Sequence, residues 1–297
     1  MTRIPQFTRA LIARPILSLG AAALLASCAG VAAQEAAAPA FDPATRITGM
    51  DNPTPPADLP QTASVLEVER YRPNYDLKGC EAAPAPRAEP SAVLAEAIAK
   101  AQAYSDEQRG LGRIVMRDGA VLHESYAEGV DSTTPSASAS MMKSVIGLLY
   151  GVAIEEGVIG SLDERVGDTL TEWNGDPRGD ITLRQLMTMS AGLGQSNFMA
   201  ILLSPNIGEA ALQVEQVSEP DTEFSYNNAI TKLLTLALDR RLATAGKGSV
   251  LTYLEDKLWC PLGNEDARVW IGQQGEARGY AGLRAGLVDC ARVGGLV

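Results

Sequence analysis

Apolar residues recur at helical spacing in four segments of the chain, each of which begins or ends at a residue that favours a helix boundary. The first segment, 91–105, begins at Ser91, a residue type that caps helix N-termini, and presents its apolar residues on one face. The same pattern predicts helices from Asp180 to about Gly192, from Asn228 to about Leu242 and from Ser249 to Leu258.

Two short runs with strand-forming residues predict a β-hairpin. Residues 111–117 and 120–126 flank Asp118-Gly119. An Asp-Gly pair between two such runs favours the tight turn of a hairpin. His123 lies in the second run. A lone histidine in a strand is more often a surface or packing residue than a catalytic one, so we assign it no chemistry.

Residues 140–155 differ from the other helical segments because their apolar side chains point in every direction around a helix. Such a pattern is typical of a buried helix. A polar loop of small residues, 129–140, precedes it. Within 140–154 the only charged residue is Lys143, which lies in the first turn. An unpaired ammonium group inside an apolar helix is strongly disfavoured, so this lysine calls for a functional explanation.

The N-terminus has the pattern of an export signal. Residues 1–27 contain three arginines, no acidic residue and an apolar stretch too short to span a bilayer. Leu25-Ala26-Ser27-Cys28 resembles a bacterial lipobox, which implies lipidation of Cys28 and a membrane-anchored lipoprotein in the periplasm. The alternative is an ordinary cleaved signal with an incidental cysteine. Residues 28–60, rich in Ala and Pro, are expected to form a flexible tether before a folded domain at 61–297.

Composition narrows the possible functions further. The chain has 25 Lys and Arg against 36 Asp and Glu, a net charge of −11, and 5% aromatic residues, which argues against nucleic-acid binding. Because the chain has one histidine, we expect neither a zinc site nor another cofactor. Export would place Cys80, Cys260 and Cys290 in an oxidising compartment. A disulfide is possible there, but the sequence gives no pairing.

Ser140 and Lys143 form a candidate nucleophile and base. Residues three apart on a helix share a face, so the two side chains can reach hydrogen-bonding distance. The helix N-terminus favours a developing oxyanion, and apolar surroundings favour the neutral amine. A neutral lysine beside a serine is a general base beside a nucleophile. The alternative is a structural lysine whose charged end reaches water at the helix terminus.

Five ordered sequence elements resemble one superfamily. They are Ser140-Met-Met-Lys143 with the apolar run that follows, Ile181 to Leu193, Phe224-Ser-Tyr226-Asn-Asn228, Leu258 to Gly263, and Gly282 to Gly294. This set resembles the serine hydrolases that include class C β-lactamases, penicillin-binding D-alanyl-D-alanine carboxypeptidases, esterases and 6-aminohexanoate-dimer hydrolases. The resemblance covers about residues 105–297.

The resemblance implies both a fold and a set of roles. The expected fold is an α/β (α+β) arrangement of the β-lactamase and DD-peptidase type, with an antiparallel sheet flanked by helices and an all-helical region. Ser140 would be the acylated nucleophile, Lys143 its partner base, Tyr226 a second general acid and base, and Asn228 a substrate-binding residue. The substrate would be a small ester, a short amide or a β-lactam, and the esterase-like and 6-aminohexanoate-hydrolase-like branch is preferred over a carboxypeptidase or β-lactamase.

One motif of the superfamily is missing. Its members carry a Lys- or His-Thr/Ser-Gly type tripeptide on a strand that also supplies an oxyanion donor, and this sequence contains no such tripeptide. We therefore expect a truncated domain that lacks its C-terminal strands. Losing one oxyanion donor costs about 10²- to 10³-fold in rate, so a non-catalytic envelope lipoprotein that uses the fold as a binding module is the rival interpretation.

Overall fold

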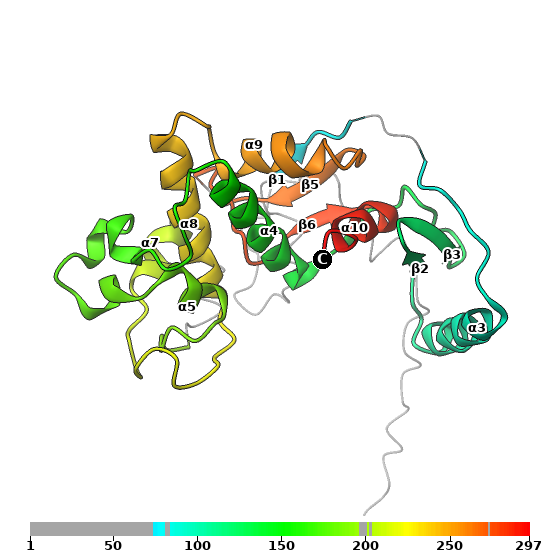
Figure 1. Ribbon diagram of the computed structural model, residues 1–297, viewed down its shortest axis with the longest axis horizontal. Coiled ribbons are helices and arrows are strands. Elements are labelled where there is room, and N and C mark those ends of the chain that lie inside the picture. The colour runs from blue at the N-terminus through cyan, green and yellow to red at the C-terminus, as the bar shows by residue number, and fades with distance from the viewer. Residues whose placement is uncertain (1–73, 81–83, 196–200, 202–203, 273) are drawn as a thin grey trace, which may run out of the picture. The chain divides into compact units, whose positions relative to one another are not determined.

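The computed structural model describes residues 74–80, 84–195, 201, 204–272 and 274–297, all within one unit of the chain (Figure 1). The expected signal, the lipidated Cys28 and the tether at 28–60 lie outside these residues. The described part combines antiparallel strands with a long run of helices, in agreement with the expected α/β (α+β) class.

A four-stranded antiparallel sheet joins segments far apart in the sequence. Its order is β1-β5-β6-β4, formed by Asn74–Leu77, Ala267–Trp270, Leu283–Ala285 and Ser136–Ala137. The sequence analysis predicted none of these strands. Each is two to four residues long, which is too short for an alternating pattern to appear.

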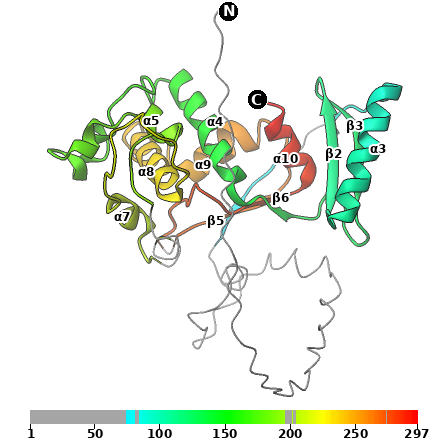
Figure 2. The ribbon, with the colours of Figure 1, turned by 90° about the horizontal axis from the view of Figure 1, so that it is seen from below.

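The second sheet is the predicted hairpin. β2 (Gly112–Arg117) pairs antiparallel with β3 (Ala120–Tyr126), and Asp118 and Gly119 between them both adopt positive φ, 51° and 76°. Two positive φ values define the turn type that Asp-Gly favours, so the prediction is confirmed. The amphipathic helix α3 (Ala92–Glu107), capped by Ser91, contacts β2. We call α3, β2 and β3 the hairpin group, and they lie together in both views (Figure 2).

Most of the remaining helices pack against α8, whereas α10 contacts β2. The helices are α4 (Met142–Glu155), α5 (Leu183–Met187), α7 (Ile207–Leu212), α8 (Asn228–Thr244), α9 (Val250–Leu254) and α10 (Leu287–Gly294). Short 3-10 turns lie at Ala139–Met141, Val166–Asp168, Thr171–Trp173 and Pro177–Asp180, and a π turn at Glu255–Trp259. α8 contacts α4, α5, α7 and α9, which together we call the helical group (Figure 1).

Two predicted helices differ from the structure. The helix expected from Asp180 to Gly192 is α5 alone, which Thr182 caps and which ends before Met189 and Gly192, both at positive φ. The helix expected over 140–155 begins at Met142, and it is not buried on all sides, because Ser144 and Gly151 are exposed. Small residues at these positions leave one face of α4 open, which counting apolar residues alone did not reveal.

The core extends from the helical group to the four-stranded sheet, and α4 and α8 supply many of its buried side chains. The hydroxyl of Tyr150 on α4 donates to the carbonyl of Leu234 on α8 at 2.8 Å and fixes one helix against the other. A disulfide joins Cys80 to Cys260, and Cys290 is free. The structure thus supplies the pairing that the sequence left open.

Candidate active site

Two helix N-termini bring the four predicted site residues together. Ser140 lies in the 3-10 turn before α4, and Lys143 lies in the first turn of α4. Asn227 caps α8 by accepting a hydrogen bond from the N–H of Ala229 at 2.9 Å, so Tyr226 precedes the helix and Asn228 is its first residue. Because α4 packs against α8, Ser140 and Lys143 lie close to Tyr226 and Asn228, although the two pairs are far apart in the sequence.

Lys143 is the centre of the arrangement. Its Nζ donates to Oγ of Ser140 at 3.2 Å, to Oδ1 of Asn228 at 2.8 Å and to the carbonyl of Tyr280 at 2.8 Å. Nζ also lies 4.9 Å from the ring centroid of Tyr226. An ammonium group has three donors and no acceptor, so three oxygen acceptors match the charged form.

The surroundings of Lys143 therefore differ from those expected. The sequence analysis placed this lysine in an apolar helix, where burial would favour the neutral amine. In the structure the side chain is half-buried and its Nζ is surrounded by oxygen atoms and aromatic rings. Two of the three acceptors, Asn228 and Tyr280, come from α8 and from the segment before β6. The apolar periodicity of one helix cannot predict such distant contacts.

The phenol of Tyr226 is more acidic than an ordinary tyrosine side chain. Partial burial by itself raises its pKa, but hydrogen bonds with Lys143 and Ser140 and the positive charge of Lys143 act in the opposite direction and lower the pKa below its ordinary value of 10.0. The side chain remains 49% exposed, so substrate can reach it. A phenol with a lowered pKa ionises more readily, and its phenolate can accept a proton from a neighbouring serine hydroxyl.

The backbone before Ser140 is held in an uncommon conformation. Ala139 adopts φ of 46°, a region that residues with a side chain rarely occupy. Such strain persists where the surroundings fix the chain, and here Ser138 donates its N–H to the carbonyl of Leu283 at 2.9 Å while β4 pairs with β6. Ser140 itself is exposed, so its hydroxyl is accessible.

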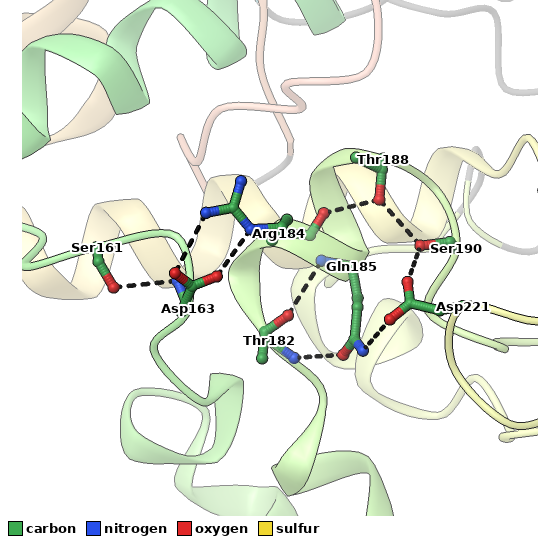
Figure 3. Close-up of polar contacts among 8 residues, drawn as sticks. All are labelled: Ser161, Asp163, Thr182, Arg184, Gln185, Thr188, Ser190 and Asp221. Carbon is green, nitrogen blue, oxygen red and sulfur yellow. Dashed lines mark hydrogen bonds and ion pairs between the residues drawn. The ribbon is translucent and has the colours of Figure 1, made fainter.

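A polar network next to α5 includes Asp221, which precedes Tyr226 in the chain (Figure 3). Asp221 accepts hydrogen bonds from Nε2 of Gln185 and Oγ of Ser190, both at 2.7 Å. These bonds lower the pKa of the Asp221 carboxyl. Gln195 donates to the carbonyl of Tyr226 at 3.1 Å. The network thus fixes the chain on the N-terminal side of the tyrosine.

Sequence reasoning missed two kinds of contribution. The first is the carbonyl of Tyr280, which any residue type could supply; the only sequence signal was the nearby pair Gly279 and Gly282. The second is the support from Gln195 and Asp221, which depends on tertiary contacts. His123 lies in the hairpin group, where its Nε2 contacts Gln102 and Ser125, and takes no part in the contacts of Lys143.

Two further features bear on the chemistry. Over the described ranges, no cluster of three or more His, Cys, Asp or Glu side chains could hold a metal ion. Within the same part of the chain, no helix has both the length and the apolar character needed to cross a membrane.

The sequence profile of the family described as Beta-lactamase matches residues 95–294, which is more than half of the chain. The chain belongs to the β-lactamase family. The predicted superfamily and the predicted β-lactamase/DD-peptidase-like fold are thereby confirmed. No curated protein matches the chain by sequence.

Solved structures of this family share the fold. A protein assigned as a 6-aminohexanoate-dimer hydrolase from Bacillus anthracis is 21% identical, with a TM-score of 0.65 over 77% of this chain and 66% of that one. An octameric penicillin-binding protein homologue from Pyrococcus abyssi is 18% identical, with a TM-score of 0.52 over 67% of this chain and 55% of that one. The D-alanine carboxypeptidase AmpC from Burkholderia cenocepacia is 19% identical, with a TM-score of 0.50 over 67% and 63%.

These likenesses establish the fold and leave the substrate open. The solved structures include a protein assigned as a 6-aminohexanoate-dimer hydrolase, a penicillin-binding protein homologue and a carboxypeptidase, all at low identity. The chain spans 55 to 66% of the length of these three structures.

Proposed function

We propose that this β-lactamase-family chain is a serine hydrolase that works by acyl transfer at Ser140. The observation that carries the proposal is the position of Lys143 Nζ, which contacts both Ser140 and Asn228 while lying beside the Tyr226 ring. A hydroxyl, a cation and a phenol in mutual contact can generate a nucleophile without a histidine.

In the proposed reaction, Oγ of Ser140 forms a bond to the substrate carbonyl carbon while its proton passes to Tyr226. The acceptor is the phenolate form of Tyr226, and the ammonium of Lys143 increases the fraction of Tyr226 in that form by lowering the pKa of the phenol. The tetrahedral intermediate collapses, and Tyr226 returns the proton to the departing alcohol or amine. Water then attacks the acyl-enzyme and gives its proton to Tyr226. Tyr226 returns this proton to Oγ of Ser140 as the acid product leaves. Asn228 would hold the substrate amide or ester.

The proposed substrate class is a small ester or a short amide. The exposure of Ser140 and Tyr226 suits substrates that approach from solvent. A β-lactam or a D-alanyl peptide is the second candidate, favoured by the fold of the carboxypeptidase and penicillin-binding relatives. The rival without catalysis is a binding module of the envelope.

We further propose that the protein is exported and held at the membrane by a lipid on Cys28. The sequence of residues 1–28 supports this location, and the Cys80–Cys260 disulfide suits an oxidising compartment.

The test uses the full chain purified from bacterial membranes in detergent. Hydrolysis of p-nitrophenyl esters, a short amide, a chromogenic cephalosporin and a D-alanyl-D-alanine peptide would be compared for wild type and Ser140→Ala. Ser144→Ala is the matched control, because Ser144 is an exposed serine in the first turn of α4, close to Ser140 in the sequence. We expect ester hydrolysis that Ser140→Ala abolishes and Ser144→Ala retains. Preferential turnover of the cephalosporin or peptide would favour the second candidate, and no turnover of any substrate would favour the binding module.

A further inference from the structure

A second lysine, Lys232, is buried in α8 one helical turn beyond Asn228. Its side chain is 1% exposed, and its Nζ donates to the carbonyl of Ala277 at 2.6 Å. Burial lowers the pKa of this lysine to about 8, although Glu276 and Asp239 raise it in part. A long apolar side chain of similar volume would fill this position without the cost of burying an amine. The donor therefore needs an explanation other than packing.

The carbonyl that Lys232 holds begins a short loop, Ala277–Gly282, which leads into β6. The loop lies tightly against α8: Gly279 has φ of 76°, and a Cβ atom there would lie 1.8 Å from Oγ1 of Thr235. Tyr280 follows, with its side chain buried and its carbonyl accepting from Lys143. The two lysines, from two different helices, thus bind carbonyls three residues apart in one loop.

We propose that Lys232 is a positioning residue for acyl transfer: by holding the Ala277 carbonyl against α8, it fixes loop 277–282 so that the Tyr280 carbonyl orients Lys143 toward Ser140. The inference rests on the proposed function. α8 then serves the site twice, through Asn228 directly and through Lys232 by way of the loop. Without the Lys232 contact, the loop loses a fixed point at its start, and Lys143 loses the alignment of one of its three acceptors.

The test is Lys232→Met in the full chain, because methionine keeps the length and bulk of the side chain and removes the donor. We expect the reaction rate of Ser140 with a fluorophosphonate to fall at least about tenfold, as a small misplacement of catalytic groups suffices for such losses. In ester hydrolysis, kcat should fall while KM stays near the wild-type value. The unfolding midpoint should stay unchanged or rise, since the buried amine is gone. Lys232→Gln, which retains an N–H donor on a shorter chain, should recover part of the rate.

Arg240→Met is the matched control. Arg240 is a cation on the same helix, but it pairs with Glu172 and donates to the carbonyl of Thr169, so its loss should leave the rate unchanged. A Lys232→Met protein that is folded and reacts at the wild-type rate would overturn the proposal. So would a rate that falls only in proportion to the folded fraction. If Lys232→Met does not fold, a Lys232→Gln protein that reacts at the full wild-type rate, while its crystal structure shows no donor contact to the Ala277 carbonyl, would overturn it as well.

A crystal structure of Lys232→Met separates this inference from the proposed function. We expect the Tyr280 carbonyl to lie beyond hydrogen-bonding distance of Lys143, whereas it lies at 2.8 Å in the wild type. If wild type and Ser140→Ala fail alike to react with the fluorophosphonate, the proposed function is wrong. An unchanged loop in the variant would instead show that Lys232 does not position it.

Discussion

The helical group and the hairpin group differ sharply in how much they bury. α4 buries six of its residues and α8 buries ten. The hairpin group buries only Ile98 and Val121. All four predicted site residues belong to the helical group or its immediate approach. The candidate chemistry therefore depends on the well-packed part of the molecule, where two helix N-termini hold reactive groups in fixed positions.

The largest expected effect is at the site itself. Lys143→Ala should lower the rate of fluorophosphonate reaction by about 10²- to 10⁴-fold, because proton transfer from Ser140 to Tyr226 depends on this cation and general acid–base catalysis contributes that much. Without the cation, the pKa of Tyr226 moves back toward its ordinary 10.0, so the limb of the pH–rate profile that rises with pH should shift to higher pH. His123→Ala in the hairpin group should leave rate and profile unchanged. A Lys143→Ala protein as active as wild type would remove Lys143 from the mechanism.

Core substitutions should separate the two groups by stability. Leu149→Ala, at a fully buried position of α4, should lower the free energy of unfolding by about 2 to 5 kcal/mol. Val121→Ala in the hairpin group should cost about 1 kcal/mol. Denaturant titration measures both values, and hydrogen exchange should show weaker amide protection in the hairpin group. Equal costs and equal protection would contradict the comparison.

In the folded protein the disulfide should stabilise the region around β1 and the π turn, which lies outside the hairpin group. It links Cys80, next to β1, to Cys260 at the end of the π turn. The double variant Cys80→Ser, Cys260→Ser should lose about 2 to 4 kcal/mol of unfolding free energy, because closing a long loop restricts the unfolded chain. Exchange rates of the hairpin-group amides should not change. Faster exchange confined to the hairpin-group amides of the double variant would contradict this prediction.

A smaller effect is expected in acid. Hydrogen bonds from Lys247 and Lys257 lower the pKa of Glu156 to about 2, and those from Arg240 do the same for Glu172. Since the ordinary value is 4.5, both carboxylates stabilise the fold above that pH, and this contribution is lost as the pH falls toward 2. Unfolding free energies measured between pH 6 and pH 2 should fall, and Glu172→Gln should flatten the curve. A curve that rises in acid would contradict the assignment.

Sequence reasoning succeeded where the signal is local. The hairpin turn at Asp118-Gly119 and the helix from Asn228 depend on neighbouring residues, and the structure has both. It failed where contacts are distant: the strands β1, β5 and β6 form only by pairing across the chain, and the Tyr280 carbonyl reaches Lys143 across 137 residues. The open face of α4 was missed because periodicity counts apolar residues and not the neighbours that cover them.

The central claim is that Ser140 is the nucleophile, and mass-spectrometric mapping of a fluorophosphonate adduct tests it most directly. The full-length protein would be labelled, digested and compared with Ser140→Ala and Ser144→Ala. We predict one adduct, on Oγ of Ser140, that is lost in Ser140→Ala and retained in Ser144→Ala. Labelling of another residue, or labelling that persists in Ser140→Ala, would contradict the account.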